Sequence, residues 1–389
     1  MAATYDIAVI GAGAFGSWTA WHLRRAAHSV LLVDAWGPGN SRASSGGESR
    51  IIRMGYGADE IYTRMSMRSL GLWQELFTQA QTQTQPPLFH RTGVLWLARE
   101  DDPYSTATRD TLTRLGVPIE IVPAAELAAR YPQMQQRDGQ TYGIFEPESG
   151  ALMARRAVAA VVQDAARNGT AYATEAVQPL FGNGPRASVR TVSGQVVSAG
   201  VFIFACGPWL PKLFPALLGQ RIYPTRQEVF FFAPPPGDRR FRPPDLPVWL
   251  DYADPRGPYG FPDLESRGFK LAFDRHGPAF DPDTGDRRVS AEGLADAHRY
   301  LAERFPALRD APLTESRVCQ YENTSNGDFL IDRHPHFDNV WLVGGGSGHG
   351  FKHGPAVGEY VSARILADDA VDARFSLAAK AQVQHRTVY

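Results

Sequence analysis

Cysteine is scarce in this chain, since Cys206 and Cys319 are the only two among 389 residues. Two cysteines cannot build a disulfide framework, so we expect a cytoplasmic protein. An excess of charge is missing as well, because 40 Lys and Arg stand against 41 Asp and Glu, for a net charge of −1. This balance gives no electrostatic footprint for nucleic acid or an anionic membrane, and we expect neither as a partner.

Long hydrophobic runs are also missing. No apolar stretch approaches the length that crosses a bilayer, and the first residues, Met1 to Asp6, lack the basic region of a signal peptide. We therefore expect no membrane association.

Metal-ligand patterns are weak. No Cys-x-x-Cys pair exists, and His349 and His353 stand four residues apart. The zinc-enzyme motif with that spacing needs a glutamate after the first histidine, where this chain has Gly350. We predict no metal site and interpret His349 as a structural hydrogen-bonding residue.

The first forty residues carry the densest motif. An apolar run, Ile7 to Ile10, is followed by Gly11-x-Gly13-x-x-Gly16, and a second apolar run ends in Asp34. Glycines at this spacing allow a tight turn, close approach of a pyrophosphate and close helix–strand packing, while the acid is placed to bind a ribose hydroxyl. The motif predicts dinucleotide binding but does not choose between NAD and FAD.

A second glycine-rich junction lies near the end of the chain. The apolar run Val340 to Val343 leads into Gly344-Gly-Gly346-Ser-Gly348-His-Gly350-Phe-Lys352, followed by a helical pattern. Such a strand-to-helix turn offers further backbone N–H groups to an anionic or carbonyl acceptor.

Length and composition predict two domains. A polar stretch, residues 78–87, looks like a linker, and residues 200–206 form an apolar run that looks like a return to the nucleotide-binding sheet. Residues 221–317 are rich in proline and aromatics and predict an antiparallel sheet. Within them, Lys270 stands among apolar neighbours, and an exposed lysine is an equally good interpretation from the residues alone.

Taken in order, these motifs make the chain resemble the monomeric sarcosine oxidase family of the D-amino-acid-oxidase-like flavoproteins. Besides the first motif, the resemblance rests on residues 47–53, 145–150, 259–262, 319–321, 329–332 and 347–352. It implies an α/β fold with FAD, not NAD, in a discontinuous Rossmann-like domain. The implied division is 1–84, 149–220 and 318–389 for FAD, with 85–148 and 221–317 forming a substrate-binding domain built on an antiparallel sheet.

The resemblance also implies the roles of individual residues. FAD is attached covalently through Cys319, although without the family this cysteine would be interpreted as a small buried hydrophobe. Arg53 and Lys352 hold the substrate carboxylate, and Lys270 serves oxygen activation beside the flavin. Arg50, Tyr259 and Tyr321 complete the catalytic set. The implied cofactor contacts are Gly11, Gly13, Gly16, Asp34, Ser45, Ser49, Arg50, Val177, Cys319, Gly346, Gly348, Gly350 and Lys352.

The chain departs from the family at two places, because sarcosine oxidases carry histidines where this sequence has Gly46 and Asp274. These changes argue against sarcosine itself, while the carboxylate pair favours another, larger amino-acid-like substrate. We therefore expect a monomeric FAD-dependent oxidase of a secondary amino acid, which uses molecular oxygen and releases hydrogen peroxide. The alternatives are a fructosyl-amino-acid oxidase, a dehydrogenase with a different electron acceptor, and a flavin-binding protein without turnover.

Overall fold

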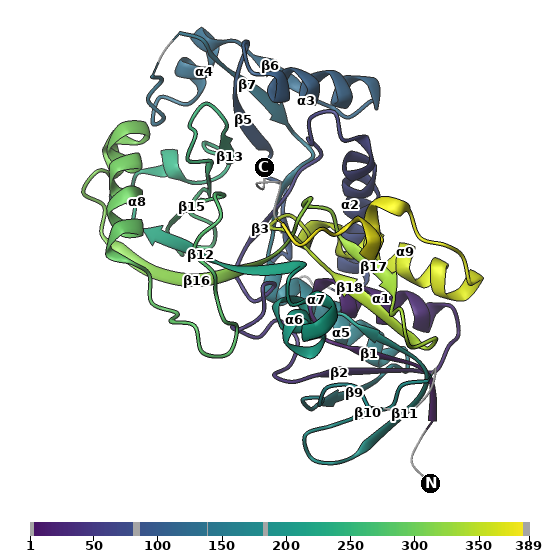
Figure 1. The fold of residues 1–389 in the computed structure, drawn as a ribbon. Coiled ribbons are helices and arrows are strands. Elements are labelled where there is room, and N and C mark those ends of the chain that lie inside the picture. Colours follow the sequence, from purple (N-terminus) through teal and green to yellow (C-terminus); the bar gives the residue numbers. More distant parts are fainter. Residues whose placement is uncertain (1–3, 81–85, 138, 182–185, 384–389) are drawn as a thin grey trace.

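The computed structural model describes residues 4–80, 86–137, 139–181 and 186–383. One end of the molecule is built on a seven-stranded sheet (Figure 1). Its order is β17 (Leu330–Arg333), β18 (Val340–Gly344), β11 (Val196–Phe204), β1 (Thr4–Ile10), β2 (Val30–Asp34) and β9 (Ala171–Thr174), with β10 (Val189–Arg190) paired to β11. The strands from β18 to β9 are parallel, and β17 and β10 pair antiparallel.

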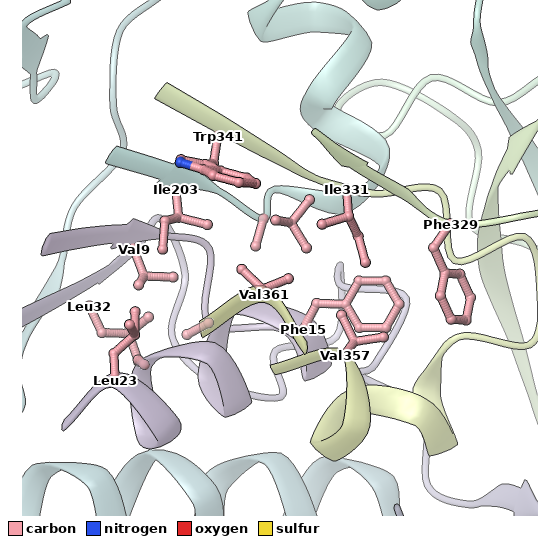
Figure 2. Packing of buried hydrophobic residues seen from close by; sticks show 14 of the residues in the cluster. Val9, Phe15, Leu23, Leu32, Ile203, Phe329, Ile331, Trp341, Val357 and Val361 are labelled. Carbon is pink, nitrogen blue, oxygen red and sulfur yellow. The ribbon is translucent and has the colours of Figure 1, made fainter. Parts of the chain in front are cut away.

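Helices cover this sheet because parallel strands are apolar on both faces. Three of them pack together over one face: α1 (Ala14–Arg25), α5 (Ala154–Arg167) and α9 (Gly354–Ala367). Figure 2 shows the resulting core, in which strand residues such as Val9 and Ile203 face Phe15 of α1 and Val357 and Val361 of α9. This packing fixes the start of α1 directly after β1.

The other end of the molecule is an eight-stranded sheet. Its order is β16 (Leu313–Thr324), β12 (Ile222–Phe232), β15 (Phe269–Phe273), β14 (Pro258–Phe261), β13 (Val248–Asp251), β5 (Val94–Arg99), β7 (Thr141–Glu146) and β6 (Glu120–Val122). The strands of residues 221–317 pair antiparallel with one another, as predicted, whereas β13 runs parallel to β5 from outside that range. Each of these two strands instead has an antiparallel neighbour on its other side, β14 and β7.

The remaining elements join the two ends. A three-stranded sheet contains β3 (Arg50–Ile52), β8 (Gly150–Leu152) and β4 (Phe89–His90). The other helices are α2 (Glu60–Ala80), α3 (Pro103–Arg114), α4 (Ala124–Arg130), α6 (Leu210–Leu213), α7 (Pro215–Leu218) and α8 (Ala291–Arg304). The helical segment after Pro208 is divided into short pieces at Pro211 and Pro215, because a proline inside a helix removes a hydrogen bond.

The mixed α/β architecture agrees with the predicted fold class. The domain boundaries stay a prediction, and the one at residue 318 falls inside β16, which pairs with β12 on both sides of that point. Of the predicted linker, residues 78–80 belong to α2 and residues 81–85 lie outside the described part of the chain. Among the described residues, no helix is both long and apolar enough to span a bilayer.

Candidate active site

An elongated cavity of about 420 Å³ lies where the carboxyl ends of β1, β2, β11 and β18 meet. This is the position at which open α/β sheets bind ligands. Of the residues predicted from the sequence, it is lined by Gly11, Gly13, Asp34, Ser45, Arg50, Val177, Cys319, Tyr321, Gly346, Gly348 and Gly350. The other predicted residues, Gly16, Ser49, Arg53, Tyr259, Lys270 and Lys352, do not line it and are located below.

The three glycines of the first motif differ in what surrounds them. Gly11 has a φ of +105°, and a Cβ there would lie 2.4 Å from the carbonyl oxygen of Ala205. A Cβ on Gly16 would lie 1.9 Å from the carbonyl oxygen of Gly11. A Cβ on Gly13 would meet only the hydroxyl of Ser45, at 3.7 Å, and would otherwise point into the cavity. Gly11 and Gly16 are thus required by the fold, whereas Gly13 keeps space open at the start of α1.

Asp34 ends β2 at the edge of the same cavity. Its Oδ2 accepts the N–H of Ala12 at 2.8 Å, and its Oδ1 accepts the N–H groups of Trp36 and Gly37 at 2.9 Å. Burial raises the pKa of this carboxyl above its usual value, against the effect of these three donors. The carboxylate therefore holds the glycine turn together and presents its remaining lone pairs to the cavity.

Several buried polar atoms in the cavity wall have no hydrogen-bond partner among the residues that the structure describes. They are the hydroxyls of Ser44 and Ser45, Oε1 of Gln320 and Oε2 of Glu322. The other oxygen of Glu322 accepts the N–H of Gly346 at 3.1 Å. Burial raises the pKa of Glu322 to about 7. Sequence reasoning missed Glu322, although an acid directly after the Cys319–Tyr321 motif is an available signal.

Cys319 and Arg50 meet at the far end of the cavity. Nη2 of Arg50 donates to the sulfur of Cys319 at 3.1 Å and to the carbonyl oxygen of Ser44 at 2.7 Å. Burial disfavours the charge on Arg50, but Cys319 and the neighbouring tyrosines keep its pKa above the ordinary value. A guanidinium beside sulfur is the kind of electropositive setting in which cysteines react as nucleophiles.

Cys206 also lines the cavity but has a different environment. Its thiol donates to the carbonyl oxygen of Ile10 at 3.3 Å, and burial raises its pKa. A raised pKa suppresses the thiolate, so Cys206 is an inert part of the wall.

Lys270 is buried on β15, close to Arg50 and Cys319. Its Nζ donates to the carbonyl oxygen of Ser49 at 2.8 Å and to the Ser49 hydroxyl at 3.1 Å, and it lies 4.2 Å from the ring centre of Phe261. Burial, and next the charge of Arg50, lower the pKa of Lys270 well below its usual value. An anion arriving nearby would favour the protonated form.

Arg53 follows β3 and is 4 % exposed. Its guanidinium carbon lies 4.6 Å from the ring centre of Tyr56 and 4.7 Å from that of Trp96, and Nη1 donates to the carbonyl oxygen of Gly55. Burial would lower the pKa of Arg53, but the surrounding tyrosines and Glu146 raise it. The guanidinium is thus a permanent buried cation stacked between two aromatic rings.

Glu146 holds the turn that carries Arg53. Its carboxylate accepts the N–H groups of Met54 and Gly55 at 2.7 and 3.2 Å, the indole N–H of Trp96 at 2.8 Å and the Ser149 hydroxyl at 2.6 Å. The resemblance covers Glu146 without assigning it a role. Only the structure brings this residue of β7 against the turn after β3.

Lys352 lies in the glycine-rich turn before α9 and is 4 % exposed. Its Nζ donates to the carbonyl oxygen of His349 at 3.1 Å and lies 5.0 Å from the ring centre of Tyr56, the ring that also contacts Arg53. Burial, and next the charge of Arg53, lower its pKa well below the usual value. The fold thus brings together two cations about 300 positions apart in sequence.

The two histidines of this turn support Tyr56 from behind. The Tyr56 hydroxyl lies 2.7 Å from Nε2 of His353 and 3.2 Å from Nδ1 of His349, whose Nε2 lies 3.0 Å from the carbonyl oxygen of Gly327. His349 therefore makes structural hydrogen bonds. Within the described ranges, no group of three His, Cys, Asp or Glu side chains is arranged to hold a metal ion.

Between the two cations and Cys319 lie Tyr321, Tyr259 and Asp274. The Tyr321 hydroxyl donates to Oδ1 of Asp274 at 2.9 Å. Burial raises the pKa of Tyr259 to about 12 and that of Asp274 to about 6. Gly46 is the other position at which sarcosine oxidases carry a histidine. A Cβ on Gly46 would lie 1.9 Å from the carbonyl oxygen of Asn40, so this backbone has no space for a histidine there.

The residues present fit FAD. The space in front of Gly13 and the N-terminus of α1 suits a pyrophosphate, and the unpartnered serine, glutamine and glutamate atoms offer bonds to a polar chain. The cavity extends from Asp34, where a ribose would lie, to Arg50 and Cys319, where the isoalloxazine would lie.

Comparisons with known proteins agree with this fit. Residues 6–364 match the family described as FAD dependent oxidoreductase. The chain is 32 % identical to the monomeric sarcosine oxidase of Streptomyces avermitilis, over 93 % of this chain and 94 % of that protein. It is 31 % identical to the N-methyl-L-tryptophan oxidase of Citrobacter koseri, over 91 % and 93 % of the two chains.

Among solved structures, the L-proline dehydrogenase of P. horikoshii superposes with a TM-score of 0.81, covering 95 % of each chain at 21 % identity, a likeness in fold. The sequence matches extend beyond the nucleotide-binding motif to nearly the whole chain. The protein is thus a member of the FAD dependent oxidoreductase family, in the group of the monomeric sarcosine oxidases and N-methyl amino acid oxidases, whose members act on amino acid C–N bonds.

Proposed function

We propose that the protein is an FAD-dependent oxidase of a secondary amino acid, either N-alkylated or cyclic. It oxidises the C–N bond to an imine, which water hydrolyses, and it reduces oxygen to hydrogen peroxide. The observation that carries this proposal is the pair of buried cations, Arg53 and Lys352, which both contact the ring of Tyr56.

Burying two cations beside each other costs free energy, and an anion bound to both would offset that cost. A substrate carboxylate would meet a guanidinium and an ammonium, which are the strong hydrogen-bond donors for that group. Glu146 fixes the turn of Arg53. The hydroxyl of Tyr56 is held by hydrogen bonds with His349 and His353. The chain therefore orients an amino acid by its acid group and leaves its nitrogen toward Tyr321 and Tyr259.

Bound FAD would supply the two-electron redox chemistry. In the proposal, the cavity residues hold its nucleotide end, and Arg50 and Lys270 place positive charge near its other end. Negative charge that develops beside Lys270 favours its ammonium form, which would stabilise that charge during the reaction with oxygen.

A flavin-reduction screen tests the substrate class. The holoenzyme is mixed without oxygen with N-methyl amino acids, cyclic imino acids, fructosyl amino acids and the corresponding amines that lack the acid group. We expect bleaching of the flavin absorbance only with the acids, and fastest with a secondary amine. Reduction by the acid-free amines at equal rates would contradict the proposal.

The acceptor is tested separately, because the fold also occurs in an L-proline dehydrogenase. We expect one hydrogen peroxide per substrate oxidised in air. A fully reduced flavin that persists in air would make the enzyme a dehydrogenase with another acceptor. Preferred reduction by fructosyl amino acids would make it a fructosyl-amino-acid oxidase.

We further propose that FAD is covalently attached through Cys319, supported by the Arg50 contact to its sulfur. Acid-precipitated protein should stay yellow, Cys319→Ala should release free flavin, and Cys206→Ala should not. A colourless wild-type pellet would contradict the linkage. A monomeric state and a cytoplasmic location complete the proposal, and sedimentation and fractionation test them.

A further inference from the structure

Asp274 places an acid in the region where the proposed function needs to bind another acid. It directly follows β15, and its N–H donates to the carbonyl oxygen of Gly257 at 2.8 Å. Its Oδ1 accepts the Tyr321 hydroxyl at 2.9 Å, and Oδ2 accepts no hydrogen bond from the described residues. The side chain is partly buried. One carboxylate oxygen is therefore held in place, and the other is available to a ligand.

Charged and titratable groups face Asp274 from every neighbouring element. The cations are Arg53, after β3, and Lys352, before α9, and both favour its ionised form. The phenols are Tyr321 of β16, Tyr259 of β14 and Tyr252 after β13.

An ionised Asp274 would repel a substrate carboxylate bound to Arg53 and Lys352 unless a positive charge lies between them. The zwitterionic form of an amino acid provides that arrangement, because its carboxylate and ammonium are one carbon apart. Its acid group would face the two cations and its nitrogen would face Asp274.

Building on the proposed function, we propose that Asp274 binds the ammonium nitrogen of a zwitterionic secondary amino acid and accepts its proton. The N–H bond breaks and an O–H bond forms on Oδ2, while the electron pair of the broken bond stays on nitrogen. This step needs no further reactant. It produces the neutral amine, whose lone pair assists oxidation of the neighbouring carbon.

The acidity of Asp274 suits this task. Burial raises its pKa to about 6, and the Tyr321 hydrogen bond and the two cations limit the increase. A proton acceptor works best when its pKa lies near the operating pH. At neutral pH Asp274 is mostly ionised, so it attracts the ammonium.

Binding of two ligands of equal shape tests the recognition of charge. Glycine betaine and tert-butylacetate (the 3,3-dimethylbutanoate anion) have the same carboxylate. Betaine carries a trimethylammonium group where tert-butylacetate carries a neutral tert-butyl group, and neither has an N–H bond that can react. Their dissociation constants are measured by calorimetry on the holoenzyme, at a pH well above the pKa of Asp274. We expect Asp274→Asn to weaken betaine relative to tert-butylacetate about tenfold or more.

The possible outcomes separate this inference from the proposed function. An unchanged ratio of the two affinities in Asp274→Asn would overturn the role of Asp274 and leave the carboxylate site intact. Failure of both ligands to bind the wild type would overturn the carboxylate site itself, and this inference with it. If the variant does not fold, the wild type alone decides. Its preference for betaine should increase as pH rises through about 6, and a constant preference would overturn the inference.

The proton transfer has its own test in the pH dependence of anaerobic flavin reduction by substrate. The wild type should lose rate as pH falls through about 6, when Asp274 becomes protonated. Tyr321→Phe removes a hydrogen bond that lowers this pKa, so the loss should shift to higher pH. In Asp274→Asn, the rate of flavin reduction should no longer fall as pH falls through about 6. If the rate still falls there in that variant, Asp274 is not the proton acceptor.

Discussion

The two ends of the proposed active site are built from different chemical groups. The nucleotide end uses the backbone: glycines that allow close approach, N–H groups at the start of α1, and one carboxylate that holds the turn. The proposed substrate end uses side chains, with Arg53, Lys270, Asp274 and Lys352 coming from three separate segments. A change at the first end should therefore act through the fold or cofactor content, and a change at the second through individual reaction steps.

The largest expected effect is at Lys270. Replacing it in Lys270→Met should slow reoxidation of the reduced flavin by roughly a hundredfold, because one well-placed charge in a dry site is worth about 3 kcal/mol. Anaerobic reduction by substrate should change much less. Stopped-flow measurement of both half-reactions checks this.

Lys352→Met is the matched control for that experiment, since it removes the other buried lysine of the site. It should weaken substrate binding and leave reoxidation near the wild-type rate. If Lys270→Met slows both half-reactions equally, Lys270 serves substrate binding or folding and not oxygen.

Arg53 should give the next largest effect. Arg53→Met should weaken binding of tert-butylacetate by about tenfold or more, because removing one partner of a buried charged set typically costs about 2–5 kcal/mol. Binding of the neutral tert-butylacetamide should barely change, and flavin content should stay at the wild-type level. Equal affinity of the variant and the wild type for the acid would show that Arg53 does not bind the carboxylate.

The smallest expected effect separates two glycines of the nucleotide end. Gly11→Ala should destabilise the protein by about 1–3 kcal/mol, because its Cβ would clash with Ala205 and its φ disfavours a side chain. Gly13→Ala should lower the flavin content and leave unfolding of the flavin-free protein unchanged. Thermal unfolding and the flavin-to-protein ratio measure these two effects. If Gly13→Ala destabilised the flavin-free protein as much as Gly11→Ala does, Gly13 would serve the fold and not cofactor binding.

The sequence predicts the nucleotide end well because its motif is local. The residues from Gly11 to Gly16 and Asp34 belong to one strand–helix–strand unit, so spacing alone indicates their arrangement. The parallel β13–β5 pair could not be predicted in this way. It joins segments about 150 residues apart, and no local pattern specifies the direction of such a pairing.

The substrate end is predictable only in part for the same reason. The resemblance identifies Arg53 and Lys352 by position, but the contact of Tyr56 with both of them depends on the tertiary fold. The same holds for Glu146, which accepts three of its four hydrogen bonds from other segments, and for the bond between Tyr321 and Asp274. Burial, which determines the pKa of Asp274, is likewise absent from the sequence pattern.

The long strand β16 makes the spacing of the site intolerant of insertion. Cys319 and Tyr321 alternate with Val318, Gln320 and Glu322, and successive residues of a strand point to opposite faces. Inserting or deleting one residue just before Cys319 would exchange the two sets while preserving most pairing with β12. All four side chains from Cys319 to Glu322 line the cavity, so the thiol and phenol would then exchange places with Gln320 and Glu322, in a strand that still forms. The length of β16 near Cys319 is therefore constrained by the positions that these side chains must take in the cavity wall.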